Sequence, residues 1–303
     1  MPSQMMDSVF ETIEHTRTRL EERLRVLSPA SEGGVALTDA MAYSLLPGGK
    51  RLRPLLTVLA ARSLGADPAL ALDPACAVEM IHTASLILDD LPCMDDALVR
   101  RGRAANHRVF GEDVASLAAV SLMSEAFGVL ARAPGLSVGT RCQVVALLAG
   151  AIGPGGLADG QVSDLSGAAA GADRASLERT AVQKTGTLFV AAAQIGARIA
   201  GAGAAAQHAL NRYALHAGLA FQICDDLLDV CGNGAALGKG LGQDRVKPTF
   251  GSVMSRAAAE RLALERYRMA REAAAELPSE PDVLTALLEM MVDSYHRRAR
   301  EAT

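Results

Sequence analysis

The sequence of 303 residues contains no tryptophan, and aromatic residues make up only 3% of it. Because strands are enriched in aromatic and β-branched side chains, this scarcity disfavours a sheet protein, whereas the abundant alanine favours helices. Hydrophobic residues make up 50% of the chain, which is enough for a sizeable core. The composition therefore predicts an all-α fold.

The chain also lacks paired cysteines and a basic surplus, and we expect no signal peptide. Its five cysteines are odd in number and none has zinc-ligand spacing, so a reduced intracellular compartment fits better than a disulfide framework. A formal net charge of −4 disfavours nucleic-acid binding. No basic segment precedes an apolar run in the first ten residues, and no uncharged apolar run is long enough to span a membrane. We expect a cytoplasmic protein with no nucleic-acid partner and no stable membrane insertion.

Apolar residues recur at helical spacing along most of the chain. The predicted helices cover residues 3–27, 36–46, 54–65, 75–91, 114–131, 141–151, 176–200 with a bend at Gly186, and 210–230, and two more flank Pro278–Pro281. A glycine-rich stretch at 153–171 interrupts the pattern, and no repeat of fixed period is present. The sequence predicts one domain over residues 1–303, built from about ten or more helices around a central cavity.

Two clusters of aspartates follow apolar helical stretches. They are Asp89, Asp90, Asp95 and Asp96, and then Asp225, Asp226 and Asp229. Carboxylates repel one another, so a fold that gathers them needs a compensating cation. Hard oxygen ligands suit Mg²⁺, which is usually shared with substrate phosphates. A calcium loop of the EF-hand type is the weaker alternative, since the first cluster lacks its glycine and terminal glutamate. The clusters predict a diphosphate held through magnesium.

Helical spacing aligns each cluster with other polar groups. His82, Ser85 and Asp89 fall at i, i+3 and i+7 on a mostly apolar helix. Gln222 precedes Asp225 and Asp226 by three and four residues, so these side chains form one stripe. Taken alone, His82 fits a hydrogen-bonded core histidine and the second stripe a solvated helix end.

Basic residues accompany both clusters. They are Lys50, Arg51 and Arg53 on a turn before a helix, Arg100, Arg101 and Arg103 after the first aspartates, and Lys184, Lys239 and Lys247 later in the chain. One basic cluster alone is usually a solvated face. Together with two acidic clusters they indicate two anionic groups side by side, one bound through metal and the other directly by arginine and lysine.

Several motifs stand in a defined order over nearly the whole chain. They are Gly-Gly-Lys-Arg-Leu-Arg-Pro at 48–54, His82 before Asp89, Arg100-Arg101, Gly160-Gln161 with Asp164, Lys184-Thr185, and Phe221-Gln222 with Asp225. In this order they resemble the trans-isoprenyl diphosphate synthases, the family of farnesyl and geranylgeranyl diphosphate synthases. Each motif alone is weak, but the ordered set is specific. The resemblance implies a prenyltransferase that is a homodimer.

The resemblance also implies a role for each matched residue. The diphosphate of isopentenyl diphosphate is bound without metal by Lys50, Arg53, His82 and Arg101. Magnesium, three ions per site, is bound by Asp89, Asp90, Asp95 and Asp225, with Asp96, Asp226 and Asp229 alongside. The allylic diphosphate (dimethylallyl, geranyl or farnesyl) is contacted by Arg100, Lys184 and Lys239. Thr185 and Gln222 place dipoles near the carbon that becomes cationic, and Lys247 lies in a later lysine motif.

The length of the product depends on the helix before the first aspartates. The residue five before Asp89 is Ala84, followed by Ser85, whereas farnesyl-producing relatives of this subtype tend to carry an aromatic ring there. Small side chains favour the twenty-carbon geranylgeranyl product, as in the bacterial synthases of carotenoid clusters that the chain most resembles. A farnesyl diphosphate synthase is the alternative. Helix packing explains Ala84 equally well.

One departure and two rival functions complete the prediction. Ala104-Ala105-Asn106 stands where the family usually has proline and threonine, and we expect a local loop change without loss of activity. A terpene cyclase usually carries an Asn/Ser/Glu second motif and an aromatic cavity, whereas this chain has a second Asp-Asp-x-x-Asp with six phenylalanines and four tyrosines. A non-catalytic partner subunit would have lost aspartates that are present here.

Overall fold

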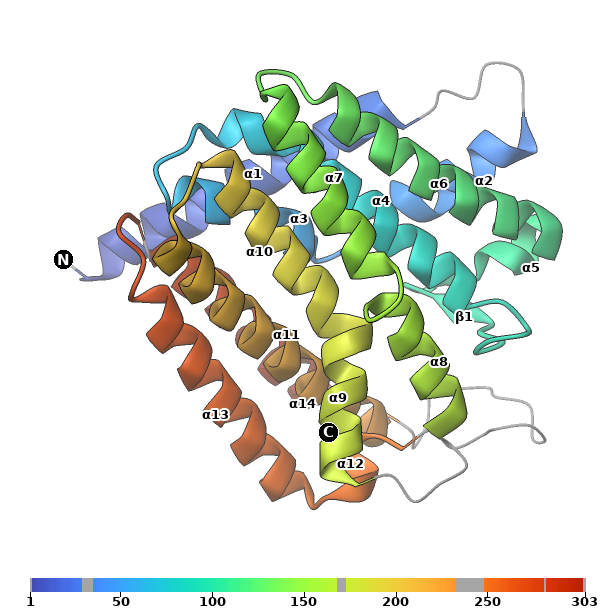
Figure 1. Ribbon diagram of the computed structural model, residues 1–303. Coiled ribbons are helices and arrows are strands. Elements are labelled where there is room, and N and C mark those ends of the chain that lie inside the picture. The colour runs from blue at the N-terminus through green and yellow to red at the C-terminus, as the bar shows by residue number, and fades with distance from the viewer. Residues whose placement is uncertain (1, 29–34, 168–172, 233–247, 281, 302–303) are drawn as a thin grey trace.

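The computed structural model describes residues 2–28, 35–167, 173–232, 248–280 and 282–301, and it confirms the all-α prediction (Figure 1). The helices are α1 (Pro2–Leu27), α2 (Ala36–Leu45), α3 (Leu52–Arg62), α4 (Leu72–Asp89), α5 (Asn106–Phe110), α6 (Glu112–Arg132), α7 (Val138–Ile152), α8 (Leu157–Gly167), α9 (Arg174–Ala181), α10 (Thr187–Ile199), α11 (Ala204–Gly232), α12 (Phe250–Val253), α13 (Arg256–Ala274) and α14 (Asp282–Glu301). A 3₁₀ turn, η1 (Pro68–Ala71), precedes α4. The two strands, β1 (Val99–Arg100) and β2 (Arg103–Ala104), form one short antiparallel hairpin.

Helix α10 lies inside the bundle and packs against α3, α7 and α11. Most of its residues from Leu188 to Ala197 are buried. Gly196 lets α3 approach closely, because a Cβ atom there would lie 2.6 Å from the carbonyl oxygen of Thr57. Figure 1 shows that α4 and α11 end, and α10 begins, toward the same end of the bundle, where α8 and the hairpin also lie. These elements carry most of the predicted site residues, which therefore lie toward that end of the bundle.

The long helix predicted for residues 176–200 contains a change of helical geometry. It consists of α9, one turn of π-helix named η2 (Val182–Gly186), and α10. The amide of Thr187 bonds the carbonyl of Val182, five residues earlier, so one extra residue enters the turn. This turn includes the predicted bend point Gly186 and carries Lys184 and Thr185.

The glycine-rich stretch at 153–171, which the sequence treats as an interruption, contains helix α8. The Asp159 side chain accepts a hydrogen bond from the amide of Gly155 at 2.7 Å and so helps to fix the turn that starts the helix. Gly160 allows α8 to lie against η2, because a Cβ atom there would be 2.4 Å from the backbone nitrogen of Lys184. The glycine is therefore a contact between two helices.

Three helical stretches are, by length and composition alone, apolar enough to cross a membrane. They are Pro68–Asp89, Glu112–Arg132 and Val138–Ser166. Within the protein, 72% of the apolar window of the first is buried, against 39% and 22% for the other two. Burial in the core thus accounts for the apolar character of α4, whereas α6 and α7 leave apolar side chains at the surface.

Candidate active site

Three of the residues predicted to bind isopentenyl diphosphate come together around α3. The Lys50 Nζ atom lies 5.2 Å from the ring centroid of Phe221 on α11. The Arg53 guanidinium lies 4.6 Å from the ring centroid of Phe189 on α10, and its Nη1 atom is 3.3 Å from Nε2 of His82 on α4. Aromatic faces stabilise such cations without neutralising them. The Lys50 and Arg53 cations and the His82 ring form one wall supported by three helices.

Burial changes the pKa of two groups in this wall. Burial lowers the pKa of Arg53 to about 10, although the charges of Glu79 and Asp225 oppose the shift. Asp225 of the second aspartate cluster therefore lies close enough to Arg53 for its charge to act on the guanidinium. Burial also lowers the pKa of His82 well below its ordinary value, and the neighbouring arginines act in the same direction. At neutral pH, Arg53 is therefore charged and His82 is neutral.

The first aspartate cluster folds back over the end of α4. The amide of Asp95 donates to the carbonyl of Asp89 at 2.9 Å, and the amide of Ala97 donates to the carbonyl of Asp90 at 3.2 Å. Asp96 adopts a left-handed backbone with φ of 46°. Asp95 therefore stays beside Asp89 at the helix end, and the side chains of Asp95 and Asp96 are exposed.

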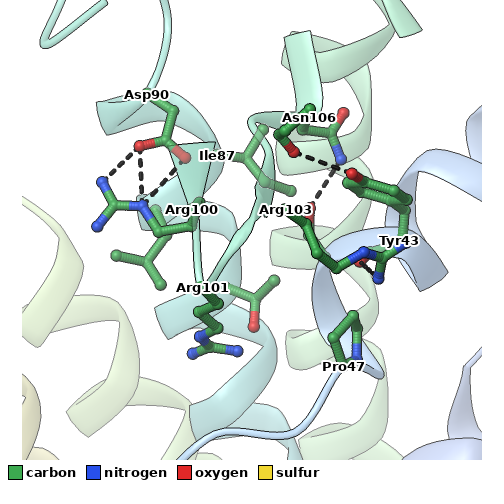
Figure 2. A pocket seen from close by; sticks show the side chains of 12 residues that line it. Tyr43, Pro47, Ile87, Asp90, Arg100, Arg101, Arg103 and Asn106 are labelled. Atoms are coloured by element: carbon green, nitrogen blue, oxygen red, sulfur yellow. Dashed lines mark hydrogen bonds and ion pairs between the residues drawn. The ribbon is translucent and has the colours of Figure 1, made fainter. Parts of the chain in front are cut away.

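The Asp90 carboxylate forms an ion pair with Arg100. It accepts hydrogen bonds of 2.9 and 3.2 Å from Nε of Arg100 and a further one from Nη2, as Figure 2 shows. Burial acts to lower the pKa of Arg100, but the hydrogen bond and charge of Asp90 outweigh it and raise that pKa. Asp90 is only 2% exposed. The two adjacent aspartates thus differ, because Asp89 instead lies near Lys184.

The π-helical turn η2 links the two aspartate segments. The Lys184 Nζ atom lies 3.7 Å from the carboxylate of Asp89 and 2.8 Å from that of Asp164 on α8. The next residue, Thr185, donates from Oγ1 to Oε1 of Gln222 at 2.7 Å. Two consecutive residues of one turn therefore contact the end of α4 and the end of α11.

On α11, a chain of hydrogen bonds continues from this contact. Gln222 donates from Nε2 to the carboxylate of Asp226 at 2.7 Å, and the amide of Phe250 donates to the other carboxylate oxygen at 3.0 Å. Asp229 lies one turn further along the helix, where the backbone alone is described. Lys239 and Lys247 lie outside the described residues. The structure thus brings together the predicted residues of α3, α4, η2 and the first turns of the α11 stripe.

Two residues of this region were quoted in a motif but given no role. Asp164 is a partner of Lys184, and Gln161 is 8% exposed with both amide atoms lacking a hydrogen-bond partner within the described structure. They fall at i and i+3 on α8, so both face one side of that helix. The three-residue spacing of Gln161 and Asp164 could have identified both as site residues. It was not used, because the glycine-rich composition of 153–171 did not predict a helix there.

A small hollow lies between α2, α4 and the hairpin (Figure 2). From α4 it is lined by Thr83, Leu86, Ile87 and Asp90, the face adjacent to the one that carries His82 and Asp89. The departure at Asn106 lies here: its Nδ2 atom donates to the carbonyl of Ala40 at 2.8 Å and to Ser44 at 2.7 Å. The loop that departs from the family pattern is therefore fixed to α2 by the hydrogen bonds of Asn106.

The two predicted chain-length residues lie in α4 outside that hollow. Ala84 is 0% exposed and belongs to the main hydrophobic core. Ser85 is also buried and donates from Oγ to the carbonyl of His82 at 2.8 Å. Both side chains are small, as the chain-length argument requires, and both have neighbours that a larger side chain would displace.

Comparisons with known proteins agree on one family. The sequence model described as polyprenyl synthetase matches residues 35–291. A farnesyl diphosphate synthase of Geobacillus stearothermophilus is 42% identical over 85% of this chain and 86% of its own length. A geranylgeranyl diphosphate synthase of Pantoea ananas is 41% identical over 84% and 83% of the two chains.

Solved structures show the same likeness. A crystal structure of an FPP/GFPP synthase from Zymomonas mobilis, in its apo form, superposes with a TM-score of 0.84 at 30% identity and covers 95% of this chain and 99% of its own. A geranyltransferase from Legionella pneumophila gives a TM-score of 0.85 at 28% identity, with 97% and 99% of the two chains covered.

Proposed function

The chain belongs to the polyprenyl synthetase family and is a prenyltransferase, and we propose that it condenses isopentenyl diphosphate head-to-tail (1′–4) with allylic diphosphates. The observation that carries this proposal is the contact of Lys184 with Asp89 and of Thr185 with Gln222. Through these contacts, the turn η2 lies beside both aspartate segments. A diphosphate bound by both segments would have its allylic carbon toward the interior of the bundle.

The residues at η2 and α4 fit the ionisation of an allylic diphosphate. The bond between the allylic carbon and its oxygen breaks, and the electron pair leaves with the diphosphate. Arg100 and Lys184 would bind that diphosphate and place positive charge where negative charge develops, and the resemblance adds Lys239, which lies outside the described residues. Lys184 is held ready by Asp164 and Asp89, and Arg100 by Asp90.

We assign the side-chain oxygens of Thr185 and Gln222 to stabilising the carbon that becomes cationic. Because Thr185 donates its proton to Gln222, its oxygen lone pairs remain for the cation. Gln222 is fixed in turn by Asp226. The double bond of isopentenyl diphosphate then forms the new carbon–carbon bond, and the proton lost from the adjacent carbon passes to the released diphosphate. No catalytic histidine is needed, because the released diphosphate accepts the proton.

The donor set fits magnesium. Among the described residues, no three His, Cys, Asp or Glu side chains lie close enough to hold a metal ion by themselves. Mg²⁺ is usually bound by one or two carboxylates plus substrate phosphates, so such a closed cage is not required. By the resemblance, Asp89, Asp90, Asp95 and Asp225 would hold the ions, three per site, with Asp96, Asp226 and Asp229 as further candidates; Asp90 would do so while bonded to Arg100. When bound, magnesium supplies further positive charge to the leaving diphosphate.

We assign geranylgeranyl diphosphate as the product, with farnesyl diphosphate as the alternative. The small side chains of Ala84 and Ser85 support the longer product, because no aromatic ring blocks the helix face below the aspartates. The relatives carry both names at nearly equal identity and so do not discriminate between the products. The resemblance to the synthases of carotenoid clusters supports a role in carotenoid biosynthesis.

The same proposal places the enzyme in the cytoplasm as a homodimer. Two large apolar side chains on α6 support the dimer, since Leu117 is 57% exposed and Val120 is 61% exposed. They lie three residues apart on one face of the helix. A second copy of the chain would cover this face.

Product analysis tests the function. Purified protein is incubated with Mg²⁺, isopentenyl diphosphate and, separately, the dimethylallyl, geranyl and farnesyl primers, and the products are separated by chromatography. We expect a twenty-carbon diphosphate. A fifteen-carbon product would identify a farnesyl diphosphate synthase, and a cyclic hydrocarbon would identify a terpene cyclase. If no isopentenyl diphosphate is incorporated, the chain is a non-catalytic partner subunit.

A further inference from the structure

Arg51 stands between two predicted isopentenyl diphosphate contacts, Lys50 and Arg53, but its own side chain is 0% exposed. Its backbone is left-handed, with φ of 49°, at the position that caps α3. A non-glycine residue keeps this conformation only when its surroundings hold it there. The contacts of Arg51 therefore show what fixes the turn.

Every nitrogen of the Arg51 guanidinium is bonded inside the protein. Nε donates to Glu21 of α1 at 2.7 Å, and Nη1 donates to Glu79 of α4 at 2.5 Å. Nη2 donates to the carbonyls of Leu45 at 2.9 Å and Pro47 at 3.3 Å, which bound the turn before Lys50. Since the side chain is 0% exposed and each guanidinium nitrogen donates to a protein oxygen, Arg51 acts on the turn and not on substrate.

Glu79 connects this turn to another predicted contact. The same oxygen, Oε1, lies 3.8 Å from Nη2 of Arg101, and the Glu79 side chain is 2% exposed. The turn itself also touches Arg101, because a Cβ atom on Gly49 would lie 3.2 Å from its Cζ atom. The turn and Arg101 are thus joined by one buried carboxylate and by direct packing.

We propose that Glu79 is a positioning residue of the isopentenyl diphosphate site. Through Arg51 it fixes the turn that carries Lys50, and through its charge it holds Arg101 over that turn. Without this carboxylate, the buried Arg51 would be left without its closest counter-charge, and Arg101 would lose its acidic neighbour. This inference rests on one part of the proposed function, namely that Lys50 and Arg101 bind the diphosphate of isopentenyl diphosphate.

Glu79→Gln keeps the shape and removes the charge. We expect it to raise the KM for isopentenyl diphosphate about 10- to 100-fold, the range for a hydrogen bond to a charged group. The KM for the allylic substrate and kcat should change less than about threefold, because α4 carries Asp89 on another face. Calorimetry with isopentenyl diphosphate in the absence of magnesium should show the same loss of affinity. Glu21→Gln is the matched control, since Glu21 also binds Arg51 but is 18% exposed, and the ion pair of Arg101 is with Glu79.

Gly49→Ala provides a second variant in case Glu79→Gln fails to fold. Its methyl group would push the Arg101 guanidinium, whereas the neighbouring Gly48→Ala meets nothing within 4 Å and serves as its control. We expect a selective rise in the KM for isopentenyl diphosphate for Gly49→Ala alone.

The outcomes separate the two proposals. A wild-type chain that incorporates no isopentenyl diphosphate would overturn the proposed function. An active wild type with unchanged KM in a folded Glu79→Gln, or in Gly49→Ala, would overturn the positioning role. An equal rise in both substrate KM values would also overturn it, because that result indicates a general distortion.

Discussion

At the scale of single residues, identical side chains in one motif have different environments. Asp89 lies beside Lys184, whereas its neighbour Asp90 is buried against Arg100. The sequence predicted both as metal ligands, and a one-dimensional motif does not show that their neighbours differ. Glu79 received no role for a similar reason: a lone glutamate in an apolar helix has no local signal, and only the folded chain brings Arg51 and Arg101 to it.

His82 makes the stability depend on pH. Burial lowers its pKa most, and the charges of four arginines act in the same direction: Arg53 of α3 first, then Arg101, Arg100 and Arg51. Above its ordinary pKa of about 6.5, His82 is neutral in both the folded and unfolded states. Below that pH the unfolded chain binds a proton that the folded chain excludes, so stability is lost as pH falls.

We therefore predict a lower free energy of unfolding at pH 5.5 than at pH 7.5, by up to about 1.4 kcal/mol per pH unit for this one proton. Urea denaturation at the two pH values measures it. His82→Gln should remove that part of the difference, while substitution of the exposed His15 by glutamine should leave it unchanged. An equal pH dependence in wild type and His82→Gln would contradict the role of His82.

At the scale of elements, the strong periodic helices were predicted closely and the short or irregular elements were not. The helix expected at 75–91 is α4 at Leu72–Asp89, because its apolar face is buried in the core. Helix α8 was missed because glycine is a poor helix former, and Gly160 is explained only by its contact with η2. Strands β1 and β2 have two residues each, too few for any alternation to be read.

The chain-length prediction belongs to helix α4. Ala84→Tyr adds an aromatic ring five residues before Asp89, about 7.5 Å along the helix axis. We predict that the product shortens toward fifteen carbons, as measured by chromatography of the dephosphorylated products. Because Ala84 is fully buried, overpacking should also lower stability by about 1–3 kcal/mol, which a urea titration measures. A folded variant with an unchanged product profile would show that Ala84 serves only helix packing.

At the scale of the whole molecule, the surface of α6 supports association. Leu117→Lys with Val120→Lys places two charges on its exposed apolar face. Light scattering after gel filtration should give twice the mass of one chain for the wild type and a single-chain mass for this variant. Leu264→Lys, on an equally exposed position of α13, should remain dimeric. A monomeric wild type, or a variant that stays dimeric, would remove α6 as the interface.

The central claim is that the two aspartate segments hold one diphosphate together. A double-mutant cycle with Asp89→Asn and Asp225→Asn tests it, with the affinity for geranyl diphosphate measured by calorimetry in Mg²⁺ without isopentenyl diphosphate. If both segments share the ligand, each single substitution should weaken binding more than about tenfold, and the double variant should lose much less than the product of the two losses. Independent, fully multiplicative losses, or a near-wild-type affinity in either single variant, would contradict the claim.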